Sequence, residues 1–119
     1  MSNRVANKDA WKYVDTLEDF TGSSMWGEWL QVGHSSDDKT WVHYDLYCVF
    51  SYGSHFPMYV FDKAYGGWLG NEDKYSRSTT RHQSQTRPDN IKTWLSTDDM
   101  KKVIRFGGLA QMTMAKAER

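Results

Sequence analysis

The stretch that decides the fold is Trp41-Val-His-Tyr-Asp-Leu-Tyr-Cys-Val-Phe-Ser-Tyr52, a run rich in β-branched and aromatic side chains. Such a composition is typical of a β-strand. Successive side chains of a strand point to opposite faces of its sheet. One face is the more apolar and is the expected core face, and it carries Val42, Tyr44, Leu46, Cys48, Phe50 and Tyr52.

Two shorter strands are predicted directly after this one. Gly53-Ser54-His55 supplies a turn, and Met58–Phe61 is the next strand, with Pro57 at its start because proline cannot donate to a sheet ladder. A second turn over 62–67 ends in Gly66-Gly67, which tolerates positive φ, and Trp68-Leu69 form the third strand. These three segments predict an antiparallel meander.

Helices are predicted on both sides of the meander. Apolar residues recur at helical spacing over 9–19, with Asn7 as the expected N-cap, and over 96–106, with a capping box at Ser96 and a C-cap at Gly107-Gly108. Residues 78–87 form a third, surface-lying helix capped by Ser78, Thr79 or Thr80, and 109–119 is either helical or frayed. Residues 25–30 are expected to form a turn or short helix around Gly27, and 34–39 a solvated loop.

The fold class expected from these patterns is α+β, a three-stranded antiparallel meander packed with two to four helices. A length of 119 residues is that of one domain, so 1–119 is expected to be a single unit. No run approaches the about 18 apolar residues of a membrane span, and the first residues lack the apolar region of a signal peptide. With one cysteine, an intrachain disulfide is excluded, and a cytoplasmic protein is expected.

Charge is unevenly distributed along the chain, although the formal net charge is 0. Residues 1–70 hold 5 basic and 9 acidic groups, whereas residues 71–119 hold 10 basic and 6 acidic groups. This asymmetry has two interpretations. It marks a basic binding face, or it reflects two halves that attract each other within one fold.

The most unusual window is Lys74-Tyr-Ser-Arg-Ser-Thr-Thr-Arg-His-Gln-Ser-Gln-Thr-Arg87, which contains four basic residues and His82 but no acid. A helix that begins near Ser78 presents free N–H groups and the positive end of its dipole, which is an anion-binding geometry. Gln83 and Gln85 are candidates for contacts with base edges. The competing interpretation is that the hydroxyls only cap a helix and the Arg and Gln side chains only solvate it. The candidate binding residues, for an anion, a nucleic acid or another partner, are Lys74, Tyr75, Arg77, Thr79, Thr80, Arg81, His82, Gln83 and Arg87.

Other chemistries have weaker support in the sequence. His82 has the residue type of a general base, with Tyr75 or Ser76 as partners, but no carboxylate nearby in sequence orients it. His34, His43, His55 and Cys48 lack the spacing of a metal motif, so no metal or cofactor is expected. Trp26, Trp29, Trp41 and Trp68 serve the core, a protein-docking patch or a stacking platform for single-stranded nucleic acid.

The 74–88 segment resembles a family of small domains of unknown function carried by phages and plasmids. Those domains pair a Lys-Tyr-Ser-x-Thr-Thr-x-x-His-Gln-Ser-like segment with an upstream Ser-Tyr-Gly strand, here Ser51-Tyr52-Gly53, and an opening similar to Phe20-Thr-Gly22. The Ser/Thr run is offset here, which leaves the cap residue open. The resemblance covers about 20–88, with 89–119 as a helical extension. It implies a phage or mobile-element origin and no particular activity.

The function expected from these observations is that of a non-enzymatic phage accessory protein. It binds a host macromolecule, as an anti-defence or host-takeover inhibitor acting in the host cytoplasm. The alternative is a nucleic-acid-binding module that uses 74–87 together with Lys101, Lys102 and Arg105. An enzyme built on His82 ranks third.

Overall fold

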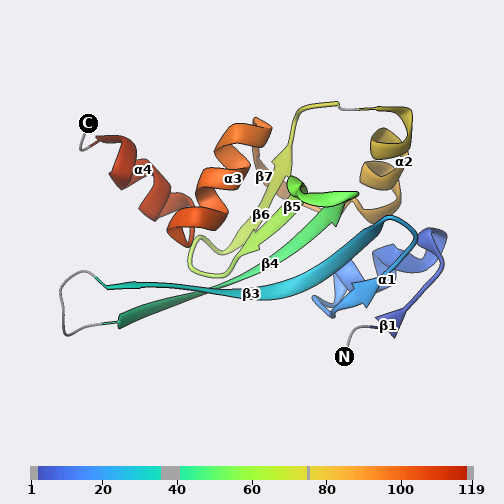
Figure 1. Cartoon of the computed structure of the whole chain (residues 1–119), viewed down its shortest axis with the longest axis horizontal. Coiled ribbons are helices and arrows are strands. Elements are labelled where there is room, and N and C mark those ends of the chain that lie inside the picture. Colours follow the sequence, from blue (N-terminus) through green and yellow to red (C-terminus); the bar gives the residue numbers. More distant parts are fainter. Residues whose placement is uncertain (1–2, 36–40, 75, 118–119) are drawn as a thin grey trace.

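The computed structural model describes residues 3–35, 41–74 and 76–117. Within them, seven strands form one sheet in the order of the chain (Figure 1). The strands are β1 Asn3–Arg4, β2 Phe20–Thr21, β3 Met25–Ser35, β4 Trp41–Ser51, β5 Gly53–Asp62, β6 Gly67–Asn71 and β7 Ile91–Leu95. The helical elements are the 3₁₀-helix η1 Asn7–Asp9 and the α-helices α1 Ala10–Asp15, α2 Arg77–Thr86, α3 Thr97–Phe106 and α4 Leu109–Ala117.

The α+β class is confirmed, but the sheet is larger than predicted. The predicted meander corresponds to β4, β5 and β6, which pair antiparallel at the centre of the sheet. β2 and β3 extend it on one side as antiparallel neighbours. The outermost pairs, β1 with β2 and β6 with β7, are parallel because helical segments connect their strands. The sheet is therefore mixed.

The prediction of a turn or short helix at 25–30 was wrong, because this segment begins β3. β3 pairs with β4 over the full length of both strands, from Met25 opposite Ser51 to Ser35 opposite Trp41. Gly27 is needed here for a close approach, since a Cβ at this position would lie 2.5 Å from the ring of Phe20. The glycine at position 27 suggested a turn in the sequence. In the structure it leaves room for the Phe20 ring of β2 against the backbone of β3.

Both faces of β4 are buried from Leu46 to Ser51, whereas the sequence predicted one core face. Tyr47 and Val49 pack in a cluster with Val14 of α1, and Leu46 and Cys48 pack on the other face in a cluster with helix α3. Two helical layers therefore cover opposite faces of the sheet. The alternation within β4 did not reveal this, because the face that carries Tyr47 and Val49 also carries the polar residues Asp45 and Ser51.

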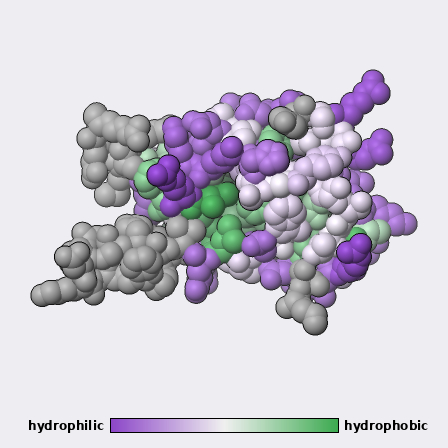
Figure 2. Space-filling view, viewed as in Figure 1, coloured by the Kyte–Doolittle hydropathy of each residue, from purple (hydrophilic) through white to green (hydrophobic). Residues whose placement is uncertain are grey.

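The helix predicted over 96–106 is confirmed as α3, with the predicted residues at both of its ends. α3 has its N-cap at Ser96, whose Oγ accepts the N–H of Asp99 at 3.2 Å, and ends at Gly107 with φ of 86°. Strand β7, directly before this helix, contains the apolar residues Ile91, Trp94 and Leu95. Figure 2 shows apolar surface gathered between α3 and β4, within an otherwise largely polar face.

Three other expectations need correction or stand untested. Helix α1 is shorter than predicted, since Leu17 already has φ of 58°. Pro57 does not begin a strand but lies inside β5, opposite Phe50 at an irregularity in the strand register. Of the loop expected at 34–39, His34 and Ser35 instead end β3, and residues 36–39 lie outside the described residues. Within the described chain, no helix is long and apolar enough to cross a membrane.

Candidate functional site

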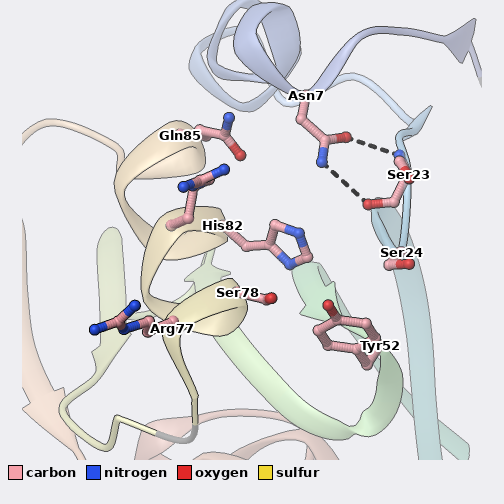
Figure 3. Close-up of a pocket in the computed structure, with 9 residues that line it drawn as sticks. Asn7, Ser23, Ser24, Tyr52, Arg77, Ser78, His82 and Gln85 are labelled. Atoms are coloured by element: carbon pink, nitrogen blue, oxygen red, sulfur yellow. Dashed lines mark hydrogen bonds between the residues drawn. The ribbon is translucent and has the colours of Figure 1, made fainter.

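A polar pocket of about 320 Å³ lies where α2 meets the turns at one end of the sheet (Figure 3). Four segments line it: the start of η1, the β2–β3 turn, the β4–β5 turn and α2. The lining residues are Asn7, Ser23, Ser24, Tyr52, Arg77, Ser78, Arg81, His82 and Gln85. None of them is an acid.

Helix α2 forms although it contains no large apolar residue. Its N-cap is Ser76, whose Oγ accepts the N–H of Thr79 at 3.1 Å. The buried face of α2 consists of four polar residues at helical spacing, Thr79, His82, Gln83 and Thr86. The helix lies at the surface as predicted, but one of its faces is buried, and the predicted cap at Ser78, Thr79 or Thr80 was wrong. The cap lies two residues before the first of these candidates.

His82 lies at the base of the pocket. It is 6% exposed, and its Nδ1 lies 2.7 Å from Oγ of Ser51, which is 1% exposed. The Tyr52 ring lies beside it, with centroids 5.4 Å apart. Burial, and then the neighbouring charge of Arg81, lowers the pKa of His82. The imidazole is therefore neutral at neutral pH, and among the described residues its Nε2 has no hydrogen-bond partner.

The two turns that form the opposite wall are fixed by backbone hydrogen bonds. The Asn7 side chain makes two hydrogen bonds to the backbone of the β2–β3 turn (Figure 3). Its Nδ2 donates to Ser23 O at 3.1 Å, and its Oδ1 accepts the Ser23 N–H at 2.7 Å. Tyr52 N–H donates to Ser24 O at 2.7 Å, which joins the β2–β3 turn to the β4–β5 turn. Asn7 was predicted to be a helix N-cap, and that prediction was wrong.

Two residues of this wall have left-handed backbone conformations. Ser24 has φ of 59° and Tyr52 has φ of 64°. Non-glycine residues with positive φ are uncommon, and such strain is found more often at binding and active sites than elsewhere. Here the strain holds the Tyr52 side chain outward, 54% exposed, beside the pocket.

The pocket is electropositive. Arg77 and Arg81 lie one turn apart on α2, and both are exposed. Ion pairs among the described residues join Lys12 to Asp9 and Lys102 to Asp98, and none involves either arginine. Ser78, the two serines of the β2–β3 turn and Tyr52 add hydroxyl groups. This set of side chains is suited to an anion that accepts several hydrogen bonds.

The structure separates the predicted site residues into three groups. Arg77, Arg81 and His82 line the pocket. Lys74 and Arg87 are exposed beyond it, and the Arg87 guanidinium lies 5.2 Å from the ring centroid of Trp94. Tyr75 lies outside the described residues.

The third group holds the loop and helix α2 in place. Thr79 and Gln83 are buried, and Gln83 Nε2 donates to the carbonyl oxygens of Asn71 and Asp73, both at 3.2 Å. Gln83 therefore has no access to a base edge, in contrast to the prediction. Thr80 Oγ1 donates back to Ser76 O at 2.9 Å.

Sequence reasoning missed the pocket residues that come from outside the 74–87 window. These are Asn7, Ser23, Ser24 and Tyr52. Within the window, Ser78 was predicted only as a helix cap and Gln85 only as a contact to a base edge, and both line the pocket. A signal for two of the segments was present. Ser51-Tyr52-Gly53 and Phe20-Thr21-Gly22 carry the family resemblance, and the structure brings them, or the residues directly after them, to helix α2.

The residues that were weighed as metal ligands are not brought together as a metal site in the described part of the chain. There, no three His, Cys, Asp or Glu side chains are grouped as metal ligands. Burial raises the pKa of the Cys48 thiol, as expected for a small buried hydrophobe. The side chains of His34, His43 and Trp41 lie outside the described residues.

Comparisons of the chain with protein-family models, with curated proteins and with solved structures find no match. The resemblance of 20–88 to the phage and plasmid family therefore stays a prediction. The function of the pocket is argued from its own geometry.

Proposed function

We propose that this chain is a non-enzymatic binding protein that recognises a nucleic acid through the phosphate groups of its backbone, using the pocket beside α2. The observation that carries the proposal is the pair Arg77 and Arg81, which have no carboxylate partner among the described residues and line a pocket free of acids. Guanidinium groups bind phosphate oxygens through two parallel hydrogen bonds. A nucleic acid is the alternative ligand predicted from the sequence, and the pocket supports it.

The surface involved is smaller than the sequence predicted. α2 lies on the same face of the sheet as α1. The Tyr59 hydroxyl belongs to that face and donates to Gln83 O of α2 at 2.7 Å. α3 covers the other face. Lys101, Lys102 and Arg105 therefore belong to the opposite side of the sheet and are not part of the proposed site.

The Ser51–His82 pair supports a binding role over a catalytic one. A serine nucleophile has to reach its substrate, but Ser51 is almost fully buried. The described residues supply no carboxylate to orient the imidazole of His82. We therefore treat the pair as a support for the pocket floor.

Fluorescence anisotropy with a labelled single-stranded oligonucleotide tests the proposal. Arg77→Ala combined with Arg81→Ala should weaken binding about tenfold or more, and should reduce the slope of log affinity against log salt, by about 0.7 for each phosphate that the variant no longer neutralises. The matched control is Lys101→Ala with Arg105→Ala, which removes the same charge from the opposite face and should leave binding unchanged. Absence of binding by the unmodified protein at low salt, or equal weakening in both variants, would contradict the proposal.

A host protein is the second candidate partner, in a phage accessory protein that inhibits host defence or assists host takeover. It is favoured by large aromatic side chains exposed away from the pocket, Trp11, Trp29, Tyr65 and Trp94. Aromatic anchors of this kind dominate many protein interfaces. Capture of a host protein that persists at high salt, survives the arginine variant and is lost on Trp29→Ala with Trp94→Ala would support this candidate instead.

A further inference from the structure

Of the described cations that the sequence predicted to contact a nucleic acid, only Arg77 and Arg81 line the pocket. Proteins that bind single strands along their length line a groove with successive positive charges. Here Arg77 and Arg81 both line one pocket, whereas the Arg87 guanidinium, at the other end of α2, lies over the ring of Trp94. The cations of α3 belong to the opposite face of the sheet. Arg77 and Arg81 are therefore the two predicted binding cations that can contact a ligand held in this pocket.

The pocket itself is bounded on three sides. In Figure 3, α2 forms one side, the β2–β3 turn with Ser23 and Ser24 lies across from it, and the segment that carries Asn7 lies at the top between them. Its volume of about 320 Å³ is at the lower end of ligand pockets, which hold a small group or a single nucleotide. A recess of this shape suits the end of a ligand more than a chain that continues on both sides.

The charge of the lining matches a phosphate monoester. A monoester carries about −1.5 to −2 charges at pH 7, whereas an internal phosphodiester carries one. Two guanidinium groups meet this charge, and the hydroxyls of Ser78, Ser23 and Ser24 supply additional donors. No carboxylate lines the pocket, so no formal negative charge in its lining repels a dianion.

Tyr52 supplies an aromatic surface next to this charge. Its ring is 54% exposed, and its backbone is held by the 2.7 Å hydrogen bond to Ser24 O. A rigid exposed ring beside a phosphate pocket is positioned to stack on the base attached to that phosphate.

We infer that the pocket receives the terminal phosphate monoester of a nucleic-acid strand, with Arg77 and Arg81 on the phosphate and Tyr52 stacked on the terminal base. The inference rests on the proposed nucleic-acid binding and specifies which part of the strand is bound.

Anisotropy with three single-stranded oligonucleotides of one sequence tests this inference. One carries a 5′-phosphate, one a 3′-phosphate and one no terminal phosphate, and the label is at the end opposite the phosphate. One phosphorylated strand should bind about tenfold or more tightly than the unphosphorylated strand, because charge-assisted hydrogen bonds are made only to its end. The arm that gains affinity identifies the end that is bound.

Two sets of variants make the test specific. Arg77→Ala with Arg81→Ala should abolish the preference for the phosphorylated strand, whereas Lys101→Ala with Arg105→Ala should retain it. Tyr52→Asn should lower affinity for the phosphorylated strand but not for inorganic phosphate used as a competitor. Asparagine is chosen because it tolerates the left-handed backbone at this position. Thermal melts of each variant show that the fold is retained.

The outcomes separate this inference from the proposed function. Equal binding of phosphorylated and unphosphorylated strands overturns the inference and leaves the proposed function standing. No binding of any strand overturns both. Tighter binding of a phosphoserine peptide than of every oligonucleotide also overturns the inference, because the phosphate then belongs to a protein partner.

Discussion

At the scale of single residues, His82 couples the core of this protein to its pocket. The ring is buried, its Nδ1 lies 2.7 Å from Ser51 Oγ, and its pKa is lowered by burial and by Arg81. Because the imidazole is neutral, it needs no carboxylate partner. The positive charge of the pocket therefore comes from Arg77 and Arg81 alone among its lining residues. The same burial makes His82 a source of pH-dependent stability.

We expect the free energy of unfolding to decrease as the pH falls below about 6.5, the ordinary pKa of histidine. The folded state lowers the pKa of His82, so over this range the unfolded chain binds more protons and stability rises with pH. Urea titrations between pH 5 and 8 measure this slope. His82→Gln should flatten the slope relative to the unmodified protein, and His55→Gln, at an exposed position, is the matched control. An unchanged slope in His82→Gln would show that His82 does not titrate as described.

At the scale of elements, α2 is held by polar contacts and not by an apolar stripe. Its cap is Ser76, and its inner face bonds to Ser51, to Tyr59 and to the backbone of the loop that precedes it. Burial raises the pKa of Tyr59 to about 12, so its hydroxyl stays protonated and donates to Gln83 O. Loss of any one bond leaves a buried polar group unpaired, which is costly.

Ser76→Ala should destabilise the protein by about 1 kcal/mol, because the Thr79 N–H loses its acceptor at the start of α2. Ser84→Ala is the matched control, since Ser84 is exposed within the same helix and should tolerate alanine with no loss. Chemical denaturation of both variants gives the difference. If the two variants have equal stability, the cap at Ser76 does not stabilise α2.

At the scale of the whole molecule, Asn71 at the end of β6 ties several parts of the chain together. Its Nδ2 donates to Pro57 O at 2.8 Å and to Thr97 Oγ1 at 2.9 Å, and its Oδ1 accepts the Asp73 N–H at 2.8 Å. Gln83 of α2 bonds to the Asn71 carbonyl. The helices on opposite faces of the sheet, α2 and α3, therefore both depend on the position of this residue.

Asn71→Ala should cost about 1–3 kcal/mol or more, because it leaves several buried groups without partners. It should also weaken ligand binding at the pocket, since the loop that Asn71 holds leads into α2. Denaturation and anisotropy on the same variant check both effects. Asn3→Ala, at an exposed residue of β1, is the control and should change neither by much. A large loss of stability with full binding would show that the pocket does not depend on this network.

Where side chains alternate or recur with strong local periodicity, the sequence by itself determined the structure. The strand at 41–51, the turn closed by Gly66 with φ of 80°, and α3 with its Ser96 cap followed from local rules. β3 did not follow, because Gly27 and its aromatic neighbours show no clean alternation. Its strand conformation depends on pairing with β4.

Only the tertiary structure decided the pocket. The buried face of α2 is polar, so no hydrophobic periodicity in 77–86 indicates which face of the helix packs on the sheet. Its orientation comes from partners far away in the chain, such as Ser51, which lies 31 positions before His82. Hydrogen bonds between distant polar groups leave no local sequence pattern. The basic window was therefore visible in the sequence, whereas its convergence with Asn7, Ser24 and Tyr52 was not.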